Sequence, residues 1–187
     1  MGYSSYTPNK VIPWEVNNMH FSDQWVAGFL DGDGSFVATG EHRPERRRFP
    51  YKINLRITFT QHERHRKVIE ALWKHLGNRG NIREVKSHKL VELVIQDRQE
   101  LRHVLGRLKY HIIIKRKQAE LMERIIAIYD TAIVNVRASL AEKEYAQIIN
   151  LVNEIRRLNS NTGGKNLKLF NPVTTQRNDS GVARKKK

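Results

Sequence analysis

A ten-residue stretch of strict two-residue alternation constrains the fold of this chain more than any other feature. From residue 51 to residue 60, apolar side chains take the odd positions and polar side chains take the even positions. Successive side chains of a β-strand point to opposite faces, so the pattern predicts a strand with one face buried and the other solvated or liganded. The buried set is Tyr51, Ile53, Leu55, Ile57 and Phe59, and the open set is Lys52, Asn54, Arg56, Thr58 and Thr60.

The rest of the sequence predicts helices and paired strands around this one. Apolar spacing predicts helices, and a capping box of Ser139 and Glu142 predicts one more. Extended runs complete two hairpins. Because hairpins alternate with helices, we expect an α+β fold: an antiparallel sheet with helices on one face, followed by C-terminal helices. The predicted helices cover 23–31, 68–76, 98–108 and 115–129, and the other extended runs cover 35–39, 81–86 and 89–95.

The two ends of the chain differ in composition from this core. Residues 1–21 contain two prolines and no periodicity, which predicts an N-terminal arm before a single domain over 22–159. Residues 160–187 carry seven basic residues against one acidic residue, which predicts a flexible basic tail. The chain has no cysteine and no secretory-type start, so we expect an intracellular protein.

The charge balance favours a polyanionic partner. The chain has 34 lysines and arginines against 19 acidic residues, a formal net charge of +15. A membrane is disfavoured because the apolar runs are far from a spanning length. Polar side chains on a β-ribbon can reach base edges in a major groove, although an ordinary solvated sheet face explains the strand equally well. The charge and the neighbouring basic loop favour nucleic acid.

The stretch WVAGFLDGDGSF poses a separate question, because its predicted helix carries two glycines and ends in two aspartates. An EF-hand loop that starts at Asp31 requires glycine where Phe36 stands and glutamate where His42 stands. A dinucleotide fingerprint requires a third glycine where Val37 stands. Neither of these two common ligand-binding motifs is therefore present.

The glycines themselves predict close packing of helices. Gly28 and Gly32, with Ala27 beside them, leave one helix face nearly bare, and glycine costs a helix interior about 1 kcal/mol relative to alanine. Two such helices packed on these faces would bring Asp31 and Asp33 of both chains together, and clustered carboxylates need a cation such as Mg²⁺. The alternative is a helix that ends at glycines with two solvated aspartates, which oppose its dipole.

The nine residues VAGFLDGDG resemble the LAGLIDADG motif of homing endonucleases. The predicted order of elements over about residues 20–160 also resembles that family's αββαββα core with its saddle-shaped sheet. No second motif is present, so the resemblance is to the single-motif, homodimeric branch of organellar and archaeal introns. It implies a chloroplast, a mitochondrion or an archaeal or bacterial cytoplasm as the location. The identical motif residues are Ala27, Gly28, Asp31, Asp33 and Gly34.

The resemblance implies roles for the motif residues. Asp33 is the expected ligand of the catalytic metals, together with the backbone carbonyl of Gly32. Asp31 is expected to be a structural or interface residue. Ala27 and Gly28 are expected at the dimer interface, where the motif helices of two subunits pack together.

Two catalytic positions outside the motif also match. Gln61 follows the alternating strand, where the family commonly has a glutamine near the scissile phosphate. Lys115 starts the segment IKRKQAE, where the family has a lysine that stabilises charge or orders solvent. A basic residue often stands one turn past the glutamine. That position holds His65 between Arg64 and Arg66, and the sequence leaves open which of the three faces the site.

The implied function is site-specific cleavage of double-stranded DNA by a homodimer. The expected cofactor is Mg²⁺, with Mn²⁺ able to replace it and Ca²⁺ binding without supporting cleavage. A non-cleaving maturase that binds intron RNA, or a DNA-binding regulator, is the alternative on the same fold, and a scaffold bound to ribosomal RNA is a third. We expect DNA contacts from the open strand face, its neighbours and the basic loop: Lys52, Asn54, Arg56, Thr58, Val37, Thr39, Arg83, Arg43, Arg46, Arg47 and Arg48.

Overall fold

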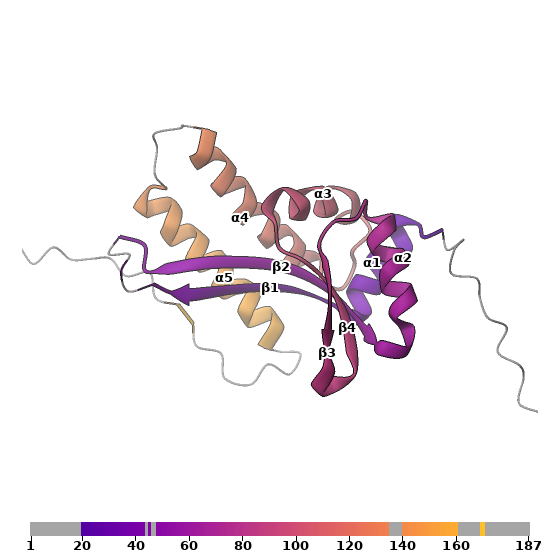
Figure 1. The fold of residues 1–187 in the computed structure, drawn as a ribbon. Helices are drawn as coiled ribbons and strands as arrows, with labels where there is room; N and C mark the ends of the chain where they lie inside the picture. Colours follow the sequence, from indigo (N-terminus) through magenta and orange to yellow (C-terminus); the bar gives the residue numbers. More distant parts are fainter. Residues whose placement is uncertain (1–19, 44, 46–47, 135–139, 161–168, 171–187) are drawn as a thin grey trace, which may run out of the picture.

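The computed structural model describes residues 20–43, 45, 48–134, 140–160 and 169–170 of the chain. It confirms the predicted α+β fold and the αββαββα order, which two further helices follow (Figure 1). Short 3₁₀ turns, η2 (Glu63–His65) and η3 (Lys86–His88), interrupt the chain. The main elements are α1 (Asp23–Asp33), β1 (Gly34–His42), β2 (Tyr51–His62), α2 (Arg66–His75), β3 (Asn81–Val85), β4 (Leu90–Ile95), α3 (Arg98–Leu108), α4 (Arg116–Val134) and α5 (Glu142–Ser160).

The four strands form one antiparallel sheet in the order β1-β2-β4-β3. β1 pairs with β2 along its whole length, from Gly34 opposite Phe59 to His42 opposite Tyr51. β4 joins β2 only in the second half of that strand. Figure 1 shows the result as a long curved β1–β2 ribbon, with the shorter β3–β4 hairpin at the end nearest α1 and α2.

The predicted burial pattern of β2 is present. Ile57 and Phe59 are fully buried and Leu55 is nearly so, and the core cluster around them takes residues from all five helices. Lys52 and Asn54, on the opposite face, are exposed. Within the described ranges, no helix combines the length and apolar character needed to cross a membrane.

The open face departs from the prediction at Thr58, which is 5% exposed. Its hydroxyl oxygen lies 2.5 Å from that of Ser35 on β1, and its backbone pairs with Val94 on β4. Thr58 lies where β2 has a neighbouring strand on each side, whereas Lys52 and Asn54 lie where only β1 is paired with it. Thr58 is therefore removed from the accessible base-reading side chains that we predicted.

The last helix begins later than the predicted capping box. α5 starts at Glu142, and the side chain of Glu144 accepts a hydrogen bond from the backbone N–H of Ala141 at 2.8 Å. This contact satisfies a donor that the helix itself leaves without a partner. Ser139, the predicted N-cap, lies outside the described residues.

One described segment of the predicted tail packs against the domain. The side-chain amide of Asn153 on α5 donates to the carbonyl of Phe170 at 2.7 Å and accepts from its N–H at 2.9 Å. The Phe170 ring lies against Gly40 of β1, where a Cβ would approach the ring to 3.0 Å, and against Tyr51. The sequence did not indicate this anchor. Most of the predicted arm and tail lie outside the described residues.

Candidate active site and nucleic-acid interface

The two faces of α1 lie in different surroundings, one against the core and the other outward. Ser22 caps the helix by accepting from the N–H of Trp25 at 3.2 Å. Val26, Ala27, Leu30 and Asp31 face the core. Ala27 is fully buried within its own chain, so it is unavailable to a partner, which corrects its assignment to a dimer interface. The outward face carries Trp25, Gly28 and Gly32 at helical spacing. The half-buried Phe29 at the edge of this face packs against the core residue Phe59, with 5.9 Å between the ring centres.

Gly28 and Gly32 leave open space on that outward face. A Cβ built at either position meets no atom within 4 Å. Neither glycine is therefore needed for packing among the described residues, although each costs the helix about 1 kcal/mol relative to alanine. Gly34 differs, because a Cβ there would lie 2.5 Å from the side chain of Leu30 and 2.9 Å from its backbone. Gly34 is required by the turn from α1 into β1.

Asp31 is a buried anchor for the loop before α4. One oxygen of its carboxylate accepts from the backbone N–H groups of Ile113 at 2.7 Å and Ile114 at 3.0 Å. The other oxygen accepts from the N–H of Lys115 at 2.9 Å. Charge-assisted bonds of this kind are about twice as strong as neutral ones. They offset the unfavourable position of a carboxylate at a helix C-terminus.

Lys115 closes the same junction from the other side. Its ammonium group donates to the α1 carbonyls of Leu30 at 2.9 Å, Asp31 at 2.7 Å and Gly32 at 3.3 Å, and to the carbonyl of Gly34 at 2.7 Å. A cation is favoured at a helix C-terminus. Burial lowers the pKa of Lys115, and the charges of Asp31 and Asp33 oppose this shift.

Asp33, the last residue of α1, is exposed beside this junction. The side-chain amide of Gln61 donates to the Asp33 carboxylate at 2.8 Å, and the Gln61 carbonyl accepts from the N–H of His62 at 3.2 Å. Gln61 thus holds one carboxylate oxygen. The structure therefore brings the three residues predicted as catalytic, from α1, β2 and the start of α4, to one place.

The donor set of one chain fits part of a magnesium site. The Asp33 carboxylate and the Gly32 carbonyl are hard oxygen donors of the kind that Mg²⁺ prefers. The Asp31 carboxylate is already engaged by three N–H groups. Among the described residues, no group of three or more His, Asp or Glu side chains could hold a metal. A complete six-coordinate site would therefore need oxygen ligands beyond these two groups.

Several charged residues predicted to contact DNA already pair with an acidic side chain of the chain itself. Arg83 is held by Glu92, at 2.7 Å from its Nε and 2.6 Å from its Nη2. Arg43 pairs with Glu41 at 2.8 Å, and Arg48 lies 3.8 Å from Glu142. Arg46 and Arg47 lie outside the described residues.

The other predicted contacts lie around Arg56, at the middle of the open face. Its Nε is buried and has no hydrogen-bond partner among the described residues. Its β1 neighbour is Val37, and Thr39 lies opposite Asn54. All four lie on the side of the ribbon that carries Lys52, because residues paired across strands share a face.

The structure narrows the choice of basic residue that faces the site among Arg64, His65 and Arg66. Arg66 is committed to Glu70 at 2.7 Å and Glu84 at 2.6 Å. Arg64 donates to the His65 ring at 3.0 Å. His65 and Arg64 therefore remain as the residues with capacity for an outside ligand.

Sequence reasoning missed an apolar surface next to the site. Ile113 and Ile114 are 76% and 75% exposed, and both follow α3 in the short loop that Asp31 anchors. The signal was the run HIIIK, in which only Ile112 is buried. An isoleucine pair held outward by buried hydrogen bonds is typical of a surface that another molecule covers.

The α+β fold places the exposed Asp33 carboxylate at the end of α1, beside Gln61 and Lys115. This arrangement is typical of an endonuclease-like class of proteins. The family profile described as LAGLIDADG endonuclease matches residues 26–120. The chain belongs to the LAGLIDADG endonuclease family. No curated protein matches it significantly.

Solved structures of other family members share the fold. The homing endonuclease I-CvuI, in complex with its target in the presence of calcium, is 24% identical over 79% of this chain and 86% of its own, with a TM-score of 0.65. The homing endonuclease I-TnaI is 23% identical over 77% and 97%, with a TM-score of 0.62. I-LtrWI, bound to its target DNA, is 22% identical over 72% of this chain and 44% of its own, with a TM-score of 0.62.

Proposed function

We propose that this protein is a site-specific double-strand DNA endonuclease that acts as a homodimer. One observation carries the proposal. Asp33, Gln61 and Lys115 come from three separate elements and meet at the end of α1, next to a helix face that the described residues leave uncovered. A protein that only binds nucleic acid has no need for this cluster.

The homodimer follows from the uncovered face of α1. Gly28 and Gly32 permit close approach of a second α1, and Trp25, 44% exposed, supplies apolar area beside them. Ile113 and Ile114 extend that apolar surface beyond the end of the helix. This chain spans less than half of the larger I-LtrWI chain, so a second copy supplies the remaining half of a comparable DNA-binding unit.

A two-fold axis along the paired helices brings two copies of Asp33 together. The two carboxylates, the Gly32 carbonyls and DNA phosphate oxygens then form an oxygen-rich site, which the described residues of one chain do not form by themselves. When bound there, Mg²⁺ supplies charge neutralisation at the scissile phosphate. Mn²⁺ replaces it, whereas Ca²⁺ binds without supporting cleavage.

The protein side chains orient these groups. Gln61 fixes the Asp33 carboxylate through one oxygen and leaves the second oxygen for a ligand. Lys115 fixes the carbonyls at the helix end and adds a positive charge near the phosphate. His65 or Arg64 provides the additional cationic contact.

The duplex lies along the open face of the sheet. Lys52, Asn54 and Arg56 read base edges, and Arg43 and Arg48 hold phosphates. The position of Arg56 supports this placement, because it lies on the same face of β2 as the exposed Lys52 and Asn54 and is itself half-buried. Two-fold symmetry of the protein makes the target a long pseudo-palindrome. One phosphodiester is hydrolysed in each strand, which leaves 3′ overhangs.

The test uses the protein and its Asp33→Asn variant on a randomised duplex library, with and without Mg²⁺, followed by sequencing of new ends. Discrete Mg²⁺-dependent ends that vanish in the variant are expected. Tight binding by both proteins without any cleavage, in a library deep enough to contain a long site, would replace the nuclease with a maturase for intron RNA or a DNA-binding regulator.

A further inference from the structure

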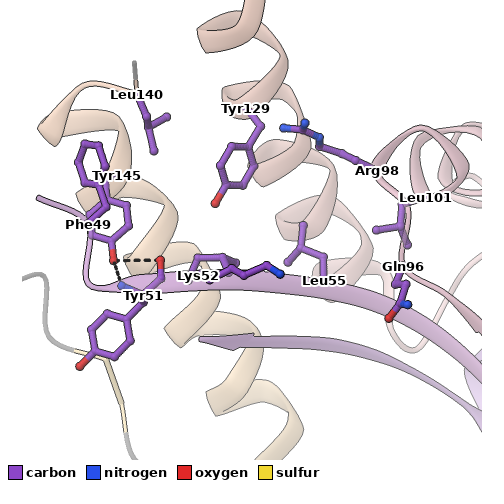
Figure 2. Close-up of a pocket in the computed structure, with 11 residues that line it drawn as sticks. Phe49, Tyr51, Lys52, Leu55, Gln96, Arg98, Leu101, Tyr129, Leu140 and Tyr145 are labelled. Atoms are coloured by element: carbon purple, nitrogen blue, oxygen red, sulfur yellow. Dashed lines mark hydrogen bonds between the residues drawn. The ribbon is translucent and has the colours of Figure 1, made fainter. Parts of the chain in front are cut away.

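A cavity of about 330 Å³ lies at the opposite end of β2 from the site (Figure 2). It is open to solvent on one side and is lined by the first residues of β2, the start of α3, α4 and the start of α5. Ten residues of β2 separate Tyr51 at the cavity from Gln61, which is about 33 Å along an extended strand. Its volume falls within the range of small-molecule sites, about 300–1,000 Å³. The endonuclease site makes no use of it.

The walls of the cavity are aromatic and apolar, and they include Phe49, Tyr129 and Leu140. The Tyr145 hydroxyl is occupied, because it accepts from the N–H of Tyr51 at 2.9 Å and lies 3.4 Å from its carbonyl. The Tyr129 hydroxyl points into the cavity in Figure 2. Burial raises the pKa of Tyr129 to about 12, so its hydroxyl remains a neutral donor at physiological pH.

The polar groups at the cavity are donors and cations. The Arg98 guanidinium lies 5.2 Å from the centre of the Tyr129 ring. None of the ion pairs among the described residues involves Arg98. Lys52 adds an ammonium group to the lining. Gln96 adds a side-chain amide, which has one donor and one acceptor side. The described lining contains no acidic residue.

We propose that this cavity binds a nucleoside monophosphate unit, with its base against the aromatic wall and its phosphate on Arg98. Aromatic faces bind bases by stacking, and arginine binds phosphate through paired hydrogen bonds. Tyr129 and Gln96 provide hydrogen-bonding groups for the base or sugar. The unit comes either from a free nucleotide or from an unpaired position of RNA, and both have this chemistry.

The cavity shares one lining residue, Lys52, with the proposed duplex surface. Leu55, which lines the cavity, faces the helical side of the sheet, whereas Asn54 and Arg56 on either side of it face the open side. A nucleotide in the cavity therefore leaves Asn54 and Arg56 free for the duplex. The duplex and the nucleotide unit are expected to bind together, with competition limited to Lys52.

Calorimetric titration of the full-length protein tests the proposal. The probes are AMP, GMP, CMP and UMP, adenosine, inorganic phosphate, benzoate and an unpaired oligoribonucleotide. At least one nucleotide is expected to bind ten times more tightly than adenosine, phosphate or benzoate, because it engages both the wall and the arginine. Tighter binding of the oligoribonucleotide than of any mononucleotide assigns the site to RNA, and the reverse assigns it to a free nucleotide.

Three variants locate the binding. Arg98→Gln is expected to weaken it at least tenfold and Tyr129→Phe about threefold, and Leu140→Trp is expected to abolish it by filling the cavity. The matched control is Arg124→Gln, which removes the same charge from an exposed position of α4. Duplex binding and cleavage are expected to be unchanged in Arg98→Gln. The experiment therefore distinguishes a failure of the nucleotide site from a failure of the proposed endonuclease function.

The proposal is overturned by any of four results. These are no saturable binding of any nucleotide or oligoribonucleotide, benzoate binding as tightly as the nucleotides, an equal loss in Arg124→Gln and Arg98→Gln, or complete displacement of the nucleotide by duplex DNA.

Discussion

The exchange of Asp31 for asparagine separates the structural aspartate of the motif from the catalytic one. The Asp31 carboxylate holds three backbone N–H groups at 2.7–3.0 Å, from Ile113, Ile114 and Lys115. An asparagine side chain of the same shape has one oxygen. In its better orientation, that oxygen keeps the two isoleucine contacts, and its NH₂ group is forced against the N–H of Lys115.

The stability lost in Asp31→Asn follows from these contacts. One charge-assisted hydrogen bond, worth about 1.5–3 kcal/mol, is lost, and two others fall to the neutral value of about 0.5–1.5 kcal/mol each. The free energy of unfolding should therefore decrease by about 3.5–6 kcal/mol. That is a large part of the total for a domain of this size, about 5–15 kcal/mol.

Urea unfolding followed by circular dichroism measures this change, and Asp33→Asn is the matched control. Asp33 is exposed and makes one hydrogen bond, to Gln61, so its exchange should cost less than about 1 kcal/mol while removing Mg²⁺-dependent cleavage. If Asp31→Asn were as stable as the parent protein, or if Asp33→Asn lost as much stability, the division of roles between the two aspartates would be refuted.

Three further outcomes are expected. Gly28→Glu should leave the single-chain fold intact, with a gain of about 0.5 kcal/mol in helix propensity, but should convert dimer to monomer in sedimentation velocity. Arg107 lowers the pKa of Asp23, with help from His75, so the stability from this pair is present above about pH 4 and is lost as pH falls through the lowered pKa. Asp23→Asn should therefore flatten the acid side of a Tm-against-pH curve, and an unchanged curve would contradict the pair's role. Arg56→Ala should cost about 1–3 kcal/mol at one base pair, whereas Arg43→Ala should weaken binding to every duplex and reduce its salt dependence. Equal effects of Arg56→Ala on all sequences would remove Arg56 from base readout.

Local patterns were enough to predict the framework. The alternation of β2 identified the buried face, because strand periodicity depends on geometry that tertiary contacts do not change. The motif predicted Asp33, and the likeness to known family members placed Gln61 and Lys115, which the structure brings together with it. None of these inferences required knowledge of the strand order.

The incorrect predictions concern residues whose burial depends on a second strand or helix. Thr58 carries the same polar alternation as Asn54, but its neighbours on β1 and β4 bury it. Ala27 belongs to the bare stretch of α1 in sequence, but it faces the core. No periodicity of a single segment contains this information, because it depends on which strand or helix lies alongside.

The spacing of the two aspartates explains why the motif needs both. Residues two apart on a helix differ by about 200° around its axis, so Asp31 and Asp33 must point to opposite sides. Asp31 points inward and ties the start of α4 to the end of α1, which also delivers Lys115 to the α1 carbonyls. Asp33 points outward from this fixed end, and its position is therefore set by the inward aspartate. The glycine between them needs no side chain for packing, which leaves the turn narrow enough for a second copy of the same helix end to approach it.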